Sequence, residues 1–224
     1  MARKFDLDKT LDELFAETTR GGRSVNLSKI VSDVVDLSGR LPENVRKSVL
    51  PLTMQKLVRI GEEDFVADAF LTFNAPEIDG IIDERMGASN YLPLRAFDSF
   101  RRFPPCSNVR DWNLYVFESY CLKKSRRFKR VALLFNKQCS GAVVRADYNA
   151  TFHEILVDAT AKSDLKNLTP GVVIDYLKDA GYIGKAKYER IDELLAAVEV
   201  ARKKLFDYES QEQPRRNRQF LRAT

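Results

Sequence analysis

The sequence predicts a mainly α protein with a small β-hairpin, a helical bundle that contains a helix-turn-helix or winged-helix-like middle segment. Apolar residues recur at helical spacing along most of the 224 residues, and residues typical of helix starts and stops frame these runs. Two short β-branched runs break this pattern. We expect an N-terminal helical region at 1–61, a helix-turn-helix or winged-helix-like region with a basic segment at 62–150, a C-terminal helical region at 151–209 and a flexible basic tail at 210–224.

Three helices are expected in the first region. The first is capped by Asp8 and stopped by Gly21 and Gly22, and the second lies between Asn26 and Gly39.

The third helix covers residues 43–60, with Pro42 at its first turn. Pro51 lies inside it. Because proline removes a backbone donor and clashes with the preceding turn, the pattern predicts a kink or a break there.

The middle region is predicted to start with three short helices near 62–72, 75–86 and 93–103, the last of them ending before Pro104. Residues 111–125 are apolar nearly all round, which is typical of a central, buried helix. A β-hairpin should follow.

This hairpin is predicted from two short aliphatic and β-branched runs, 130–135 and 141–146, which five residues connect. Thr151 and Glu154 then have the spacing of a capping box. The remaining helices are expected from Thr169-Pro170 to Gly181 and over 188–206.

Composition excludes several classes of protein. Hydrophobic residues make up 44%, which argues against disorder, and no apolar run reaches the ~18–20 residues that a membrane-spanning helix needs. The charged start, Met1 to Thr10, does not have the pattern of a secretory signal, so we expect a cytoplasmic protein. The widely spaced Cys106, Cys121 and Cys139 are expected to be reduced thiols.

Charge is polarised along the chain, although the net charge is only +5. Residues 62–84 carry eight acids and no base, whereas residues 95–130 carry ten bases and three acids. The tail adds four arginines and no acid from Pro214 onward. Such polarity is a clue to binding partners rather than to fold.

The sequence contains no complete catalytic or metal-binding motif, and we expect neither an enzyme nor a bound cofactor or metal. His153 is the only histidine, which limits triads and histidine metal sites. Asp79 and Asp83 would share one helix face. A solvated face is the preferred interpretation, and a metal-dependent nuclease is an alternative.

The basic segment is the best functional signal, and it suggests a non-catalytic nucleic-acid-binding protein, for duplex DNA rather than RNA. Clustered cations neutralise phosphates, and a helix at 93–103 would present a basic front for a major groove. The predicted nucleic-acid-binding residues are Arg95, Arg101, Arg102, Lys123, Lys124, Arg126, Arg127, Lys129, Arg130, Lys137 and Arg145.

Two other interpretations stay open. Charged faces can also dock proteins, so the chain could be a helical adaptor, a homo-oligomer or a subunit of a larger assembly. The aromatic residues between the bases are expected to be core rather than base-stacking platforms. Asn113, Glu118 and Asn136 are expected to be buried and hydrogen-bonded, with a small polar pocket as the alternative.

Overall fold

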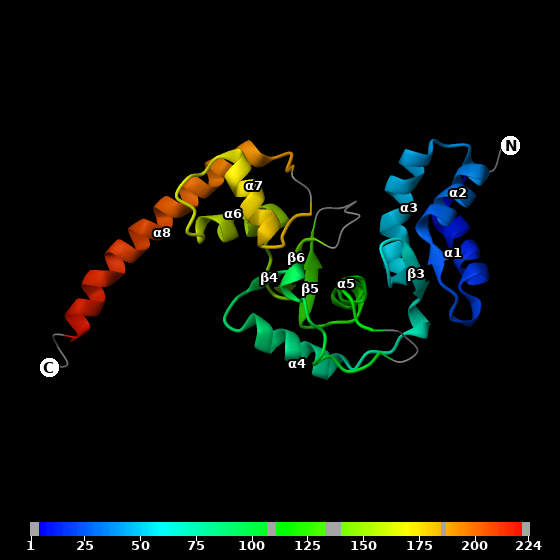
Figure 1. Cartoon of the computed structure of the whole chain (residues 1–224), viewed down its shortest axis with the longest axis horizontal. Helices are drawn as coiled ribbons and strands as arrows, with labels where there is room; N and C mark the ends of the chain where they lie inside the picture. Colours follow the sequence, from blue (N-terminus) through cyan, green and yellow to red (C-terminus); the bar gives the residue numbers. More distant parts are fainter. Residues whose placement is uncertain (1–4, 107–110, 133–139, 185–186, 221–224) are drawn as a thin grey trace. The chain divides into compact units, whose positions relative to one another are not determined.

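The computed structural model describes residues 5–106, 111–132, 140–184 and 187–220, and of residues 208–220 it describes the backbone alone. Within these ranges the chain forms eight α-helices and two three-stranded antiparallel sheets (Figure 1). The predicted mainly α class is confirmed. The chain divides into two compact units, Met1–Asn149 and Ala150–Thr224.

Helix α1, Leu7–Thr18, begins one residue before the predicted cap. Asp6, not Asp8, is the N-cap, because its carboxylate accepts hydrogen bonds from the backbone of residues 8 and 9. Helix α2, Leu27–Ser38, is bounded as predicted by Asn26 and by the left-handed Gly39.

Helix α3, Pro42–Lys56, is not divided at Pro51, and it ends before the predicted residue 60. Pro51 removes the hydrogen bond to the carbonyl of Lys47. That carbonyl lies on the exposed side of the helix, where water can replace the lost donor. Residues 57–59 leave the helix and form a strand.

The first sheet joins β1 (Val25–Asn26), β2 (Leu57–Arg59) and β3 (Asp64–Ala67) in the order β1-β3-β2. The helix predicted at 62–72 is therefore wrong, since β3 and a 3-10 turn (η2, Asp68–Phe70) occupy it. Phe65 packs into the cluster formed by α1, α2 and α3, and Val66 packs into a second cluster with Leu71 and Val116. Because both faces of β3 are buried, its apolar residues do not alternate with polar ones.

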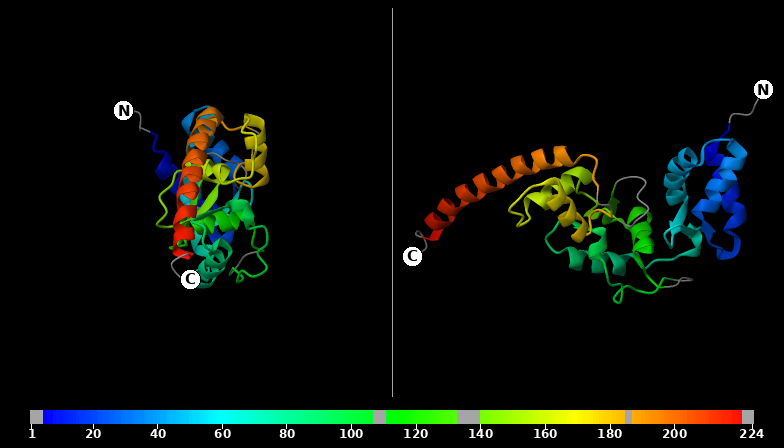
Figure 2. Two further views of the ribbon diagram at one scale, coloured as in Figure 1. Left: turned by 90° about the vertical axis from the view of Figure 1, so that its left-hand side faces the viewer. Right: turned by 45° about the horizontal axis from the view of Figure 1, so that its top comes forward.

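The second half of this unit contains α4 (Ala75–Met86), α5 (Leu114–Lys123) and the sheet β4-β6-β5 (Tyr91–Pro93, Ala142–Arg145, Phe128–Val131). Both helices were predicted. The hairpin is confirmed as the antiparallel pair β5–β6, in which Val131 lies opposite Ala142; residues 133–139 of its connection fall outside the described residues. Figures 1 and 2 show α4, α5 and this sheet lying together.

The helix predicted at 93–103 is also wrong. The segment contains a 3-10 turn (η3, Leu94–Ala96) and a later turn that Phe103 closes onto Phe100. Turns of three residues place every third side chain on one side, so Leu94, Phe97 and Phe103 still share a core without an α-helix. The predicted recognition helix is consequently absent from these residues.

The second unit consists of α6 (Phe152–Ala161), α7 (Pro170–Asp179) and α8 (Ile191–Phe220). The capping box of Thr151 and Glu154 is confirmed. Helix α8 continues well past the predicted end at residue 206 and past α6 and α7, as Figure 2 shows, so the flexible tail predicted from residue 210 is helical through Phe220. None of the described helices is long and apolar enough to cross a membrane.

Candidate nucleic-acid interface

Lys123 and Lys124, at the end of α5, bind one internal carboxylate. Their Nζ atoms lie 3.0 Å and 2.6 Å from the carboxylate of Asp68, which follows β3. Burial alone would raise the pKa of Asp68, but the hydrogen bond from Lys124 and the ion pair with Lys123 outweigh it, and the pKa lies below its usual value. Both lysines are therefore occupied within the protein.

Asp83 on α4 pairs in the same way with two predicted phosphate contacts, Arg127 and Arg145. The Nη1 atom of Arg145 lies 2.6 Å from Asp83, and the same guanidinium donates to the carbonyls of Gly87 and Ser89. Hydrogen bonds from Arg145 and Arg127 lower the pKa of Asp83. This carboxylate ties α4 to one end of the β5–β6 hairpin, where β5 begins and β6 ends.

Glu84, the next residue on α4, receives Arg102 in a two-pronged ion pair, with nitrogen–oxygen distances of 2.9 and 2.6 Å. Both side chains are more than 60% exposed, so this pair adds little to stability.

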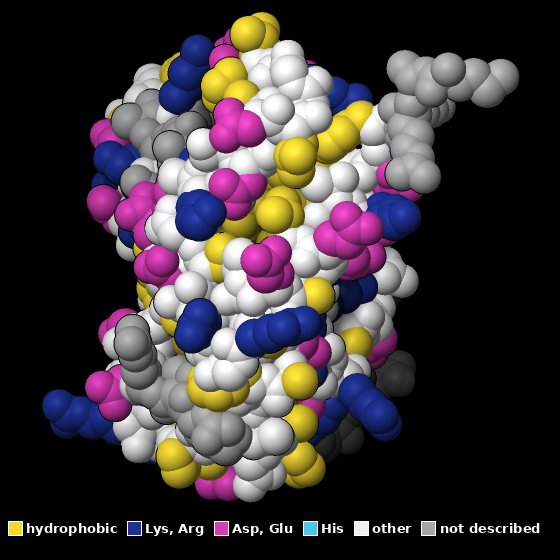
Figure 3. Space-filling model, turned by 90° about the vertical axis from the view of Figure 1, so that its right-hand side faces the viewer, with side chains coloured by type: hydrophobic (Ala, Val, Ile, Leu, Met, Phe, Trp, Pro, Cys, Tyr) yellow, Lys and Arg dark blue, Asp and Glu magenta, His cyan; other side chains and the backbone are white. Residues whose placement is uncertain are grey.

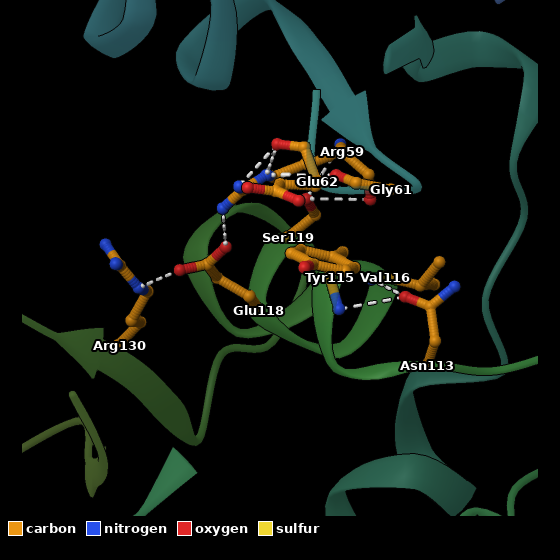
Figure 4. Close-up of polar contacts among 9 residues, drawn as sticks. All are labelled: Arg59, Gly61, Glu62, Asn113, Tyr115, Val116, Glu118, Ser119 and Arg130. Atoms are coloured by element: carbon orange, nitrogen blue, oxygen red, sulfur yellow. Dashed lines mark hydrogen bonds and ion pairs between the residues drawn. The ribbon is translucent and has the colours of Figure 1, made fainter. Parts of the chain in front are cut away.

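Glu118 on α5 is fully buried and lies between two arginines (Figure 4). Arg59 of β2 and Arg130 of β5 approach its two carboxylate oxygens at 3.0 and 2.6 Å. Arg59 also donates to the carbonyls of Gly61 and Glu62, and its guanidinium lies 4.6 Å from the centre of the Tyr115 ring. Arg130 is thus a structural residue, and burial of Glu118 is confirmed.

Asn113 is hydrogen-bonded, as predicted, but it is half-buried rather than buried. It caps α5 and donates to the carbonyl of Ile60, 3.1 Å away. Asn136 lies outside the described residues.

Of the other predicted contacts, Lys129 donates to Ala146 and Asn149, whereas Arg95, Arg101 and Arg126 have exposed side chains. Lys137 lies outside the described residues. The acidic segment thus neutralises much of the basic segment. From the sequence, the two segments were expected to form separate surfaces. The structure does not gather the ten predicted residues that it describes into one free basic face.

The aromatic residues of this region are core, as predicted. Phe97 and Phe117 have ring centroids 4.5 Å apart, and Phe103 and Trp112 are 4.9 Å apart. At these distances the rings fill the space between them, and a base cannot stack there.

Asp79 is not on a solvated face, which corrects the preferred interpretation of the acidic helix. It is 5% exposed and accepts hydrogen bonds from Tyr120 and Ser125, at 2.8 and 2.7 Å.

Among the described residues no group of three or more His, Cys, Asp or Glu side chains could hold a metal. His153 is hydrogen-bonded to Tyr188, 2.8 Å away.

Acid should weaken the pairing of the two segments. The pKa values of Asp68 and Asp83 are lower in the folded protein, so the stabilisation is present above the unfolded value of about 3.9 and is lost as pH falls through the folded values. We expect the melting temperature to fall once the pH drops below about 4. Asp83→Asn should melt lower at pH 6 and show a smaller fall, and identical profiles for both proteins would contradict this.

Sequence reasoning missed a polar surface on α3. Asn44, Lys47 and Ser48 are exposed at helical positions i, i+3 and i+4, and Gln55 is exposed three turns beyond Asn44. Lys47 forms an exposed i,i+4 ion pair with Glu43, at 3.0 Å. The signal was present in the sequence, because these residues fall on one side of the predicted helix, opposite its apolar face.

The surface that carries α1 and α2 has mixed charge. Figure 3 views the side of the first unit that carries α1 and α2, and it shows Lys and Arg side chains interspersed with Asp and Glu.

Comparisons with protein-family models, curated protein sequences and solved structures find no match to this chain.

Proposed function

We propose that residues 7–67 form a winged-helix module and that the protein binds duplex DNA through α3. The order of elements supports the module: α1, β1, α2, α3, β2, β3, with the strands in the order β1-β3-β2. Helices α2 and α3 are joined by a three-residue turn that contains Gly39, which is typical of a helix-turn-helix. In such a module the second of these helices enters the major groove.

A second module of the same topology is proposed at residues 75–145, within the region where the sequence suggested a winged helix. Its order is α4, β4, α5, β5, β6, and its strands follow the order β4-β6-β5. In the part of the segment between β4 and α5 that the structure describes, η3 and further turns stand in place of a second helix. Helix α5 occupies the recognition position, but it is buried, with Ser119 bonded to the backbone of Arg59. The helix in the recognition position is therefore exposed only in the first module, where it is α3.

The exposed face of α3 is the observation that carries the proposal. Asparagine and glutamine pair with adenine, lysine with guanine, and serine with either kind of edge in the major groove. Asn44, Lys47, Ser48 and Gln55 provide these groups on one side of the helix. The turn between β2 and β3 contains Glu62 and Glu63 and no lysine or arginine, so the proposed wing itself supplies no cation to the phosphates.

The test is fluorescence anisotropy at low salt with a labelled duplex of mixed sequence. Asn44→Ala combined with Lys47→Ala should weaken binding at least about tenfold, because each base contact contributes about 1–3 kcal/mol. Lys9→Ala is the control, since this exposed lysine on α1 has the same charge.

Absence of binding by the unmodified protein would refute the proposal. If the double variant Arg101→Ala with Arg126→Ala loses binding and the α3 variant does not, the basic segment contacts the DNA, and the proposed role of α3 is refuted.

A second candidate function is that of a helical adaptor. Leu37 and Leu41, at the turn between α2 and α3, are 62% and 70% exposed. Two exposed large apolar side chains at the same turn suit a protein partner. Light scattering after size exclusion should then show an oligomer that Leu37→Ser with Leu41→Ser converts to a monomer.

A further inference from the structure

The side chain of Glu63 is held by groups from two helices. The guanidinium of Arg46 on α3 and the hydroxyl of Ser28 on α2 each bind one of its carboxylate oxygens. The backbone carbonyl of Glu63 also accepts a hydrogen bond from the N–H of Leu27, 2.7 Å away. The turn between β2 and β3 therefore places one carboxylate between α2 and α3.

The two side chains that hold Glu63 have the chemistry of a phosphate contact. Arginine and serine are common donors to DNA phosphates, and a guanidinium matches two oxygens of a carboxylate or a phosphate equally well. Ser28 lies in the first turn of α2, a twelve-residue helix, and in helix-turn-helix proteins this helix crosses the DNA backbone.

The Arg46–Glu63 ion pair can also open, so that another anion can replace the carboxylate. Arg46 and Glu63 are each 25% exposed, so water reaches them and the carboxylate can leave without the core opening. Lys47, one residue further along α3, lies on the surface proposed to enter the groove. A phosphate beside that groove would approach the same two donors.

We infer that a DNA phosphate takes the place of the Glu63 carboxylate, and that Glu63 competes with DNA for Arg46 and Ser28. This inference rests on the proposed function. It adds a phosphate subsite at the junction of α2 and α3 and a built-in limit on affinity, because each binding event must displace an internal anion.

Glu63→Gln tests the inference. It removes the competing charge and should tighten binding of the duplex about fivefold in the anisotropy assay at low salt. Glu62→Gln is the matched control: it makes the same change of net charge in the same turn, at an exposed residue whose carboxylate does not bind Arg46. Its effect should be clearly smaller.

Arg46→Gln in the Glu63→Gln background should remove the gain and reduce the slope of log affinity against log salt by about 0.9, the value for one phosphate. Circular dichroism melting confirms that each variant is folded. Equal affinities for Glu63→Gln and Glu62→Gln would overturn the inference while leaving the α3 proposal intact. If no duplex binds and the α3 variants have no effect, the proposed function fails and the inference fails with it.

Discussion

Replacing Glu118 with alanine should lower the free energy of unfolding of the first unit by about 3–5 kcal/mol. The carboxylate is fully buried between Arg59 and Arg130, whose side chains are 2% and 11% exposed. Removing it leaves two guanidinium groups away from water without their anion, and the cost of such unpaired buried charges exceeds that of a lost surface pair.

Urea unfolding followed by tryptophan fluorescence measures this loss, because Trp112 is the only tryptophan and lies near the start of α5. Glu84→Ala is the control: it breaks the exposed pair with Arg102 and should leave the unfolding midpoint nearly unchanged. Glu118→Gln keeps the shape but not the charge, so its midpoint should lie between those of the unmodified protein and Glu118→Ala. A loss below about 1 kcal/mol for Glu118→Ala would mean that water reaches the arginines.

The same network explains why the second proposed module does not offer a recognition helix. Arg59 binds the carbonyls of Gly61 and Glu62 with one side of its guanidinium and Glu118 with the other. It therefore connects the turn of the first sheet to α5. A helix that is held in this way cannot also lie in a groove, which leaves α3 as the exposed candidate.

The sequence predicted those elements whose signals are local. Caps, prolines and glycines act within one turn, so α2, the capping box of α6 and the start of α7 at Pro170 could be read directly. Strand β3 could not, because Phe65 and Val66 face different cores and their spacing imitates a helix. Periodicity cannot distinguish a strand buried on both sides from a helix.

The internal pairing of the predicted contact residues could not be predicted for a related reason. Sequence shows where charges lie along the chain but not which charges meet. Asp68 and Lys124 are 56 positions apart, and Asp83 and Arg145 are 62 positions apart. The basic segment is a real feature of the sequence, yet folding uses much of it to neutralise the acidic segment. The polar side of α3 carries few charges, so a search for basic runs does not find it.

Among the charged side chains that the structure describes in the second unit, Arg202 should contribute most to the unit's stability. It extends from α8 and donates to the carbonyls of Thr160, Ser163 and Leu165, at 3.2, 2.9 and 2.6 Å. These carbonyls lie at the end of α6 and just after it. One guanidinium thus satisfies several acceptors and places a positive charge at the negative end of a helix.

Arg202→Ala should destabilise the second unit by about 2–3 kcal/mol, the scale of hydrogen bonds to a charged group in a partly buried site. Hydrogen exchange of the full chain should show the loss of protection in α6 and at the start of α7. Arg202→Lys should recover only part of it, because one ammonium group cannot reach three separate carbonyls. Lys203→Ala removes the same charge from the neighbouring exposed position and should leave exchange unchanged. Equal exchange in Arg202→Ala and Lys203→Ala would show that these contacts do not hold the unit together.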